Sequence, residues 1–252
     1  MTHVLITGAA GGIGAAIAAR FAADDDVRLT CTDLRPAEPA DLAVPSEFRA
    51  ADLTEPGVAE QLIDPADPPD VLVNAAGIYP ARLLLEMTPA DWDRVQAVNV
   101  RAPMALTVAC ANALVAAGRP GAVVNISSGA ATRARAGAAH YATSKAALEM
   151  LTRACAVELG PHGIRVNAVA PGFVTVDSDA NPVTEAYADA VSRNPLGRRG
   201  DPADIAGAVH WLCGPGAGWT TGAVLRVDGG ATAGTAELPL HWSGETSVQA
   251  AS

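Results

Sequence analysis

HVLITGAAGGIG occupies residues 3–14, and this stretch decides the fold class. Its first five residues are apolar enough for a buried strand, and a helical pattern of small residues follows over 12–23. The turn between them contains Gly8, Gly12 and Gly14, which let the backbone approach a pyrophosphate whose charge is favoured by a helix N-terminus. Strand, glycine-rich turn and helix in this order predict a dinucleotide-binding unit. A plain tight turn is the alternative interpretation.

The same alternation of short apolar strands and amphipathic helices continues along the chain. Seven segments are predicted strands: 3–7, 27–32, 47–51, 70–74, 122–127, 165–170 and 223–227. Helical patterns separate them, around 12–23, 57–63, 88–117, 140–160 and 202–213. Such alternation predicts parallel strands joined by right-handed crossovers. We therefore expect an α/β fold, a Rossmann-type doubly wound sheet of about seven strands with helices on both faces.

Two segments interrupt this alternation. The connection 34–46 contains three prolines, too many for a long helix, and 175–200 is a polar loop around a short helical stretch. Residues 1–234 are predicted to form a single dinucleotide-binding domain, followed by a C-terminal extension over 235–252. Because apolar side chains cluster at 237–243, we expect that part of the extension to dock on the subunit surface.

Composition excludes several classes of function. The formal net charge of −10 argues against binding a nucleic-acid backbone, and no uninterrupted apolar run reaches the length of a membrane span. The chain enters its first strand at once, which leaves no room for a secretory signal. Its four cysteines are scattered without a CxxC pair, as in reduced cytosolic proteins, so we expect a cytoplasmic protein without a metal site.

The second strand leads to Asp33, nineteen residues after Gly14. A carboxylate at this place accepts hydrogen bonds from the adenosine ribose hydroxyls and repels a 2′-phosphate. The glycine-rich turn contains no Lys or Arg, although Arg35 lies nearby. The pattern therefore predicts NAD(H) as cofactor over NADP(H). An Asp that only caps the strand end is the alternative.

A further motif, YATSK, occupies residues 141–145 in the predicted helix 140–160. Tyr141 and Lys145 are four residues apart and therefore project from one helix face. A phenol titrates near about 10, and nearby positive charge lowers that pKa towards neutral pH. The pair can thus exchange a proton with a substrate. A solvated aromatic–cation pair on the surface is the alternative.

These motifs together resemble those of the short-chain dehydrogenase/reductase family over residues 2–234. TGAAGGIG fits its TGxxxGxG loop, NAAG at 74–77 is its motif unaltered, and YATSK contains its YxxxK. Pro171-Gly172 and VDGG at 227–230 complete the pattern. The resemblance implies hydride transfer between a nicotinamide cofactor and a carbonyl carbon.

Four catalytic positions follow from the resemblance: Asn99, Ser128, Tyr141 and Lys145. Tyr141 would exchange the proton with the reacting oxygen, and Ser128, thirteen residues before it, would hydrogen-bond that oxygen as charge builds. Asn99 would hold a water that links Lys145 to solvent. A loop hydroxyl at Ser128 and a buried amide that ties off backbone groups at Asn99 are the alternatives.

The predicted cofactor contacts include the glycine-rich turn, the ends of several strands and part of the catalytic helix. They are Gly8, Gly12, Ile13, Gly14, Asp33, Asp52, Leu53, Asn74, Ala75, Gly77, Tyr141, Lys145, Pro171, Gly172 and Val174. The sequence departs from the family at Val176, where a Thr is usual, and in the shortened connection after Asp33. That Thr contacts the nicotinamide carboxamide in the family, and Val176 has no hydroxyl for this contact.

The predicted reaction is the NAD-dependent interconversion of a secondary alcohol, or a dihydrodiol, and a ketone, with a small-molecule substrate. An NADPH-dependent reductase of 3-oxoacyl or polyketide substrates and a dinucleotide-binding regulator without turnover remain open. Asp33 weighs against the first alternative, and retention of all four catalytic positions weighs against the second.

Substrate contacts are expected from Ser128, Tyr141 and Arg135, whose guanidinium could clamp a carboxylate bidentately. Arg135 and the short connection after Asp33 together resemble dehydrogenases of dihydroxylated cyclohexadiene carboxylates. A solvated loop Arg is the alternative, while Tyr79 and His140 are expected to line or cover the pocket.

The family resemblance also implies a homotetramer or homodimer, with helices 88–117 and 140–160 packing against their symmetry mates. Small residues on these helices would permit close approach: Ala105, Ala109, Ala113, Ala147 and Ala154.

Overall fold

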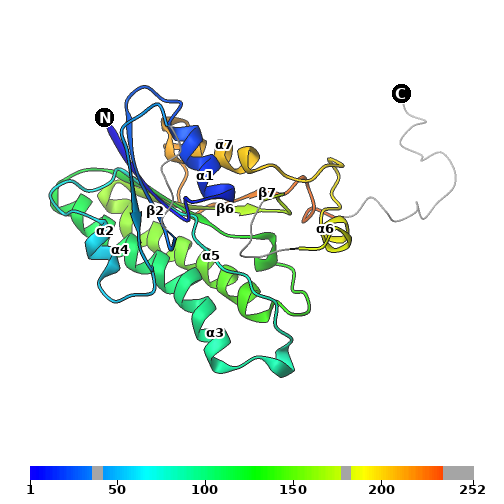
Figure 1. The fold of residues 1–252 in the computed structure, drawn as a ribbon. Helices are drawn as coiled ribbons and strands as arrows, with labels where there is room; N and C mark the ends of the chain where they lie inside the picture. Colours follow the sequence, from blue (N-terminus) through cyan, green and yellow to red (C-terminus); the bar gives the residue numbers. More distant parts are fainter. Residues whose placement is uncertain (36–41, 177–182, 235–252) are drawn as a thin grey trace, which may run out of the picture.

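The computed structural model describes residues 1–35, 42–176 and 183–234 (Figure 1). At its centre lies one parallel sheet with the strand order β3-β2-β1-β4-β5-β6-β7. The strands are β1 (Thr2–Thr7), β2 (Val27–Asp33), β3 (Ser46–Ala50), β4 (Val71–Asn74), β5 (Gly121–Ile126), β6 (Ile164–Pro171) and β7 (Val224–Val227). The predicted seven-stranded, doubly wound sheet is confirmed.

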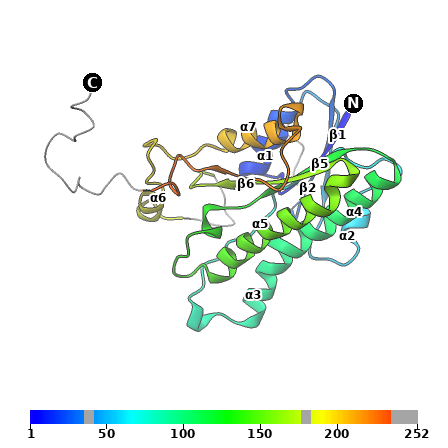
Figure 2. The same cartoon turned by 180° about the vertical axis from the view of Figure 1, so that it is seen from behind.

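Helices cover both faces of the sheet (Figures 1 and 2). They do so because the central strands direct apolar side chains to both faces. In β1, Val4 and Ile6 belong to one hydrophobic cluster and Leu5 to the other. The first cluster includes α1 (Gly12–Phe21) and α7 (Pro202–Cys213). The second includes α2 (Val58–Leu62), α4 (Ala102–Ala116) and α5 (Ala139–Leu159).

Capping boxes start two of the helices where the sequence places them. Thr88 and Asp91 exchange side-chain and backbone hydrogen bonds at the start of α3 (Pro89–Gln96). Asp201 and Asp204 do the same at the start of α7. In each box the N-cap residue is followed directly by a proline, whose missing N–H would have no partner at that position.

The predicted helix 88–117 forms one rod of three consecutive helical segments. A π-helical segment over Ala97–Arg101 lies between α3 and α4. Pro103 follows this segment and has no N–H to donate to the carbonyl of Asn99, four residues before it. Such π segments often occur at functional sites, and Asn99 is fully buried within this one. The sequence pattern does not reveal this change of helix type.

By length and composition alone, the rod Pro89–Ala116 could cross a membrane. Half of its most apolar stretch is buried inside the molecule, as in the core helix of a folded domain. This property is not evident from apolar runs, because polar residues divide the rod into short ones.

Ala113 does not lie where the expected subunit contact would need it. Its side chain is buried in the hydrophobic cluster between α4 and the sheet of the same chain. The exposed apolar residues of this layer are larger: Met104, Val108 and Val115 on α4, and Met150 and Val157 on α5. The expected docking of 237–243 and the middle of the connection after Asp33 lie outside the described residues.

Candidate active site

The strand order changes direction between β1 and β4, so their carboxyl ends form the crevice in which such sheets bind ligands. The Thr7 hydroxyl at the end of β1 accepts hydrogen bonds from the backbone N–H groups of Ala75 and Ala76, each at 3.1 Å. Gly8 follows with a positive φ of 70°, and a Cβ there would lie 2.7 Å from Ala76 N. The glycine-rich turn and the NAAG segment are therefore in direct contact.

The glycine-rich turn fits a pyrophosphate. Gly11 is the N-cap of α1 and supplies no side-chain cap, and the first turn of the helix contains no acidic residue. The amides at this helix end are thus left for an anion. Gly14 packs so closely that a Cβ would lie 2.0 Å from the carbonyl oxygen of Gly8, and Gly12 has a φ of 55°.

Asp33 ends β2 beside this turn. Its Oδ2 accepts a hydrogen bond from Ala10 N at 3.2 Å, and its Oδ1 accepts one from Leu34 N at 2.8 Å. Each carboxylate oxygen has a further lone pair, so the side chain can still accept hydrogen bonds from ribose hydroxyls.

Three other predicted cofactor contacts differ in how far their side chains are already hydrogen-bonded or packed within the protein. Asp52 accepts hydrogen bonds from the N–H and hydroxyl of Thr54, which lower the pKa of its carboxyl. Leu53 packs against the cluster under α2 and α4. The Asn74 side chain is buried and donates to Asn125 Oδ1 at 2.8 Å, so it joins β4 to β5 inside the sheet.

The predicted cofactor contacts after β6 lie at the same edge of the sheet, since β6 is parallel to β1 and β4. A Cβ on Gly172 would lie 2.8 Å from the Cα of Asp228, so the backbone there packs directly against the segment after β7. Val174 forms an isolated bridge with Gly200. Val176 lies over the glycine-rich turn, since its Cγ1 is 3.3 Å from the place of a Cβ on Gly12.

Two elements bring the predicted reacting residues together. Ser128 follows β5, and Tyr141 and Lys145 lie in the first turns of α5. The Ser128 hydroxyl lies close enough to the Tyr141 phenol to lower the pKa of that phenol. Lys145 Nζ lies 5.8 Å from the centroid of the Tyr141 ring and donates to the carbonyl oxygen of Ile126 at 2.7 Å. The sequence spacing alone predicts this helix face, and the structure adds Ile126 as the acceptor that holds the lysine.

Burial dominates the electrostatics of this pair. It lowers the pKa of the Lys145 ammonium to about 8. It raises the pKa of the Tyr141 phenol, against the hydrogen bond from Ser128 and the positive charge of Arg135. The protein groups by themselves therefore do not produce the expected lowering of the Tyr141 pKa.

Asn99 ties off backbone groups. Its Oδ1 accepts from Ile78 N at 2.9 Å, and its Nδ2 donates to Ile78 O at 2.9 Å and to Ser144 Oγ at 3.0 Å. A Cβ on Gly77 would lie 3.4 Å from both Asn99 Oδ1 and Lys145 Nζ, so the amide lies near the lysine. The Ser144 hydroxyl in turn donates to the carbonyl oxygen of Tyr141 at 2.7 Å. The sequence indicates no such role for Ser144.

Two further tyrosines and one cation lie near the reacting phenol of Tyr141. The rings of Tyr79 and Tyr141 have centroids 5.8 Å apart, and the Arg135 guanidinium carbon lies 5.3 Å from the ring centroid of Tyr187. Tyr187 belongs to α6 (Glu185–Val191), which sequence reasoning did not connect with the site. His140 is fully buried, and its Nδ1 accepts from Tyr141 N at 3.0 Å, so it supports the helix start and does not line a pocket.

Comparisons with known proteins agree with this arrangement. The family model described as enoyl-(acyl carrier protein) reductase matches residues 8–232. The (3R)-3-hydroxyacyl-CoA dehydrogenase of Rattus norvegicus is 40% identical over 250 residues, covering 90% of this chain and 94% of the relative.

Two solved structures show the same fold. A protein from Agrobacterium tumefaciens with bound NADP is 34% identical, with a TM-score of 0.84, and covers 92% of this chain and 96% of its own. A 4-hydroxyisoleucine dehydrogenase complexed with NADH is 28% identical, with a TM-score of 0.85, and covers 93% and 100%. The chain therefore belongs to the short-chain dehydrogenase/reductase family, as an oxidoreductase that interconverts a secondary alcohol and a ketone with a nicotinamide dinucleotide.

Proposed function

We propose that the enzyme uses NAD(H) and that Tyr141 is its general acid–base. The observation that supports this is the placement of the Tyr141 phenol against the Ser128 hydroxyl and near Lys145 Nζ, with Ser128 in the loop after β5 and the other two residues on α5. When bound, the nicotinamide ring accepts or delivers the hydride. Tyr141 then donates a proton to the ketone oxygen in reduction, or accepts one from the alcohol in oxidation.

Ser128 and Lys145 assist this proton transfer. The Ser128 hydroxyl donates to the reacting oxygen as negative charge develops on it. Lys145, held on the Ile126 carbonyl, keeps a positive charge near the phenol below its pKa of about 8 and so favours the phenolate form of Tyr141. A panel of secondary alcohols and ketones, assayed by NADH and NADPH absorbance, tests the reaction. Absence of turnover with every member would contradict it.

The preference for NAD(H) rests on the carboxylate of Asp33 beside the glycine-rich turn. Changing Asp33→Ser should lower the ratio of kcat/KM for NADH to that for NADPH at least about tenfold, because the repulsion of a 2′-phosphate is removed. Asp25→Ser is the matched control, since it removes an exposed carboxylate beyond the far end of α1. Equal use of both cofactors by the unmodified enzyme would show that Asp33 does not select between them.

A reductase of 3-oxoacyl thioesters is a second candidate, favoured by the rat relative named (3R)-3-hydroxyacyl-CoA dehydrogenase. Acetoacetyl-CoA distinguishes it from a reductase of free ketones. We expect slower turnover of this thioester than of the best free ketone in the panel.

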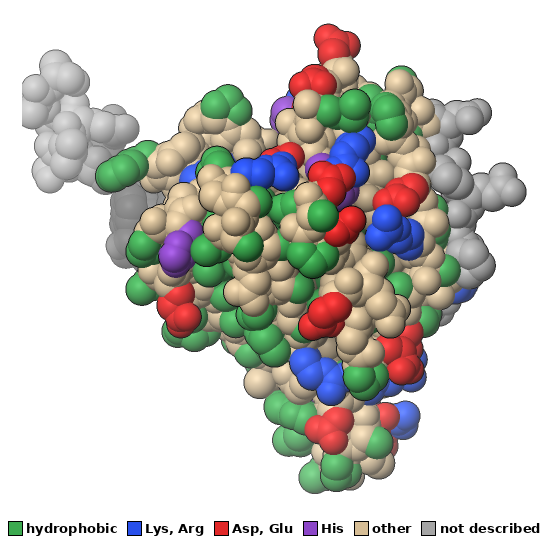
Figure 3. Space-filling view, turned by 90° about the vertical axis from the view of Figure 1, so that its left-hand side faces the viewer, with side chains coloured by type: hydrophobic (Ala, Val, Ile, Leu, Met, Phe, Trp, Pro, Cys, Tyr) green, Lys and Arg blue, Asp and Glu red, His purple; other side chains and the backbone are tan. Residues whose placement is uncertain are grey.

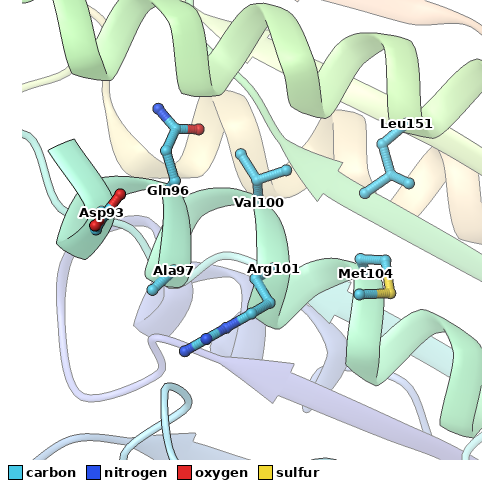
Figure 4. A pocket seen from close by; sticks show the side chains of 7 residues that line it. All are labelled: Asp93, Gln96, Ala97, Val100, Arg101, Met104 and Leu151. Atoms are coloured by element: carbon cyan, nitrogen blue, oxygen red, sulfur yellow. The ribbon is translucent and has the colours of Figure 1, made fainter. Parts of the chain in front are cut away.

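We further propose a cytoplasmic homotetramer or homodimer assembled through the α4–α5 layer. The four free cysteines fit a reducing compartment. The layer exposes large apolar side chains, and a hollow of about 480 Å³ opens beside them on the helical rod (Figure 4). It is lined by Asp93, Gln96, Ala97, Val100, Arg101, Met104 and Leu151. On the face shown in Figure 3, acidic and basic side chains are interspersed.

Val157→Glu should lower the mass measured by light scattering, because a buried carboxylate at the subunit contact would be unpaired. Val157 is 77% exposed in the single chain, so folding of the subunit should not suffer. Val183→Glu makes the same change at an exposed position away from α4 and α5 and should leave the mass unchanged. An equal mass for all three proteins would place any subunit contact elsewhere.

A further inference from the structure

We infer that the substrate is an anionic secondary alcohol or ketone with a ring or planar segment. Arg135 binds its carboxylate, and the rings of Tyr79 and Tyr187 bind the rest of the molecule beside Tyr141. This inference rests on the proposed function and names the substrate class of the same site.

The aromatic residues of the chain are unevenly distributed. Only 4% of the chain is aromatic, and it has three tyrosines in all. One follows β4, one begins α5 and one lies on α6, yet Tyr79, Tyr141 and Tyr187 converge on one place. The Tyr79 and Tyr141 rings are tilted by 54°, so they form two walls of a corner and not a closed stack. Such walls bind the faces of a ring or planar substrate.

Arg135 is the cation of this cluster. Its guanidinium lies over the face of Tyr187, and its charge opposes the burial that raises the pKa of both Tyr79 and Tyr141. Stacking uses the flat face of a guanidinium and leaves the N–H groups on its edge for a planar, bidentate anion.

Two other arginines, Arg82 and Arg199, are paired with carboxylates, whereas Arg135 is not. Arg82 pairs with Asp91, and Arg199 pairs with two acidic residues of α6. Within residues 1–35, 42–176 and 183–234, Arg135 has no carboxylate partner, and its side chain is exposed. In a chain with a net charge of −10, an unpaired cation beside the reacting phenol points to an anionic substrate.

The surroundings of Arg135 supply apolar space. It borders a hollow of about 470 Å³ whose other walls are mostly apolar: Leu83, Leu84, Leu85, Glu86, Ala136, Gly137 and Ala139. The volume is within the range of pockets that hold small organic ligands. Arg135 therefore borders both the Tyr187 ring and this hollow, so an anionic group held by its guanidinium would lie beside apolar surface.

The first experiment compares 3-oxocyclohexanecarboxylate with its methyl ester as substrates with NADH. We expect kcat/KM to be at least about tenfold higher for the acid, because charge-assisted hydrogen bonds to Arg135 are lost in the ester. Arg135→Gln should lower kcat/KM for the acid by about 10- to 100-fold and leave the value for the ester nearly unchanged. Arg135→Lys should restore part of the loss, since it returns the charge without the bidentate geometry.

Arg133→Gln is the matched control. It removes an exposed arginine two residues away, whose guanidinium donates to the carbonyl oxygen of Ala231 and not to the tyrosine cluster. The acid should remain the preferred substrate of this variant. If Arg135→Gln and Arg133→Gln behave alike, the assignment of Arg135 is wrong.

A binding measurement separates this inference from the proposed function. In the presence of NADH, cyclohexanecarboxylate should raise the melting temperature more than cyclohexanecarboxamide, and Arg135→Gln should abolish the difference. Turnover of the ester without any preference for acids overturns the inference and leaves the oxidoreductase function standing. Arg135-dependent binding of the acid without turnover of any ketone supports the inference and contradicts the proposed oxidoreductase function.

Discussion

Tyr141→Phe is expected to lower kcat by at least about 10²-fold, the scale of a lost general acid–base. The substitution removes one hydroxyl and keeps the ring that contacts Tyr79. It also removes the phenol oxygen that the Ser128 hydroxyl lies near. The effect should therefore fall on the chemical step and not on the packing of α5.

Two measurements accompany this prediction. NADH affinity, followed by fluorescence titration, should change much less than kcat, because the glycine-rich turn is untouched. Thr143→Ala is a control on an exposed position of the same helix turn and should keep kcat within about twofold. Near-normal turnover by Tyr141→Phe would rule out Tyr141 as the proton donor.

Gly14→Ala should damage both dinucleotide binding and stability. A Cβ at this position would lie 2.0 Å from the carbonyl oxygen of Gly8 and 2.7 Å from its carbonyl carbon, and backbone atoms cannot turn aside as a side chain can. The start of α1 must move away from the end of β1, which costs about 1–3 kcal/mol or more. We expect the melting temperature to fall by at least about 5 °C and NADH affinity to fall at least about tenfold.

Gly207→Ala is the matched control, since Gly207 is also a helical glycine. It lies on the exposed side of α7, and an added Cβ would meet nothing within 4 Å. Because Ala is the better helix former, this variant should melt at the same temperature or slightly higher. Equal melting temperatures and NADH affinities for the two variants would show that the glycine-rich turn tolerates a side chain.

Much of the architecture could be predicted because its signals are local. Alternating apolar runs predict strands, and a turn that needs Gly8 and Gly12 at positive φ needs glycine in the sequence. The capping residues Thr88 and Asp201 act within one helix turn. Tyr141 and Lys145 are separated by one turn of the same helix, so their common face follows from helix geometry alone.

The candidate site could be predicted only in part from such signals. The family resemblance indicates Asn99, but its partners at Ile78 and Ser144 come from two other parts of the chain. Tyr187 carried no motif, and its place over Arg135 depends on how α6 folds back towards α5.

The sequence by itself therefore determined the fold class, the glycine-rich turn and the helix face that presents Tyr141 and Lys145. Each of these depends on backbone geometry within a few residues. The tertiary structure alone decided that the three tyrosines converge, that Asn74 lies inside the sheet and that burial raises the pKa of Tyr141. These properties depend on which distant residues exclude water from a group or supply its hydrogen-bond partner, and both are set only when separate elements pack together.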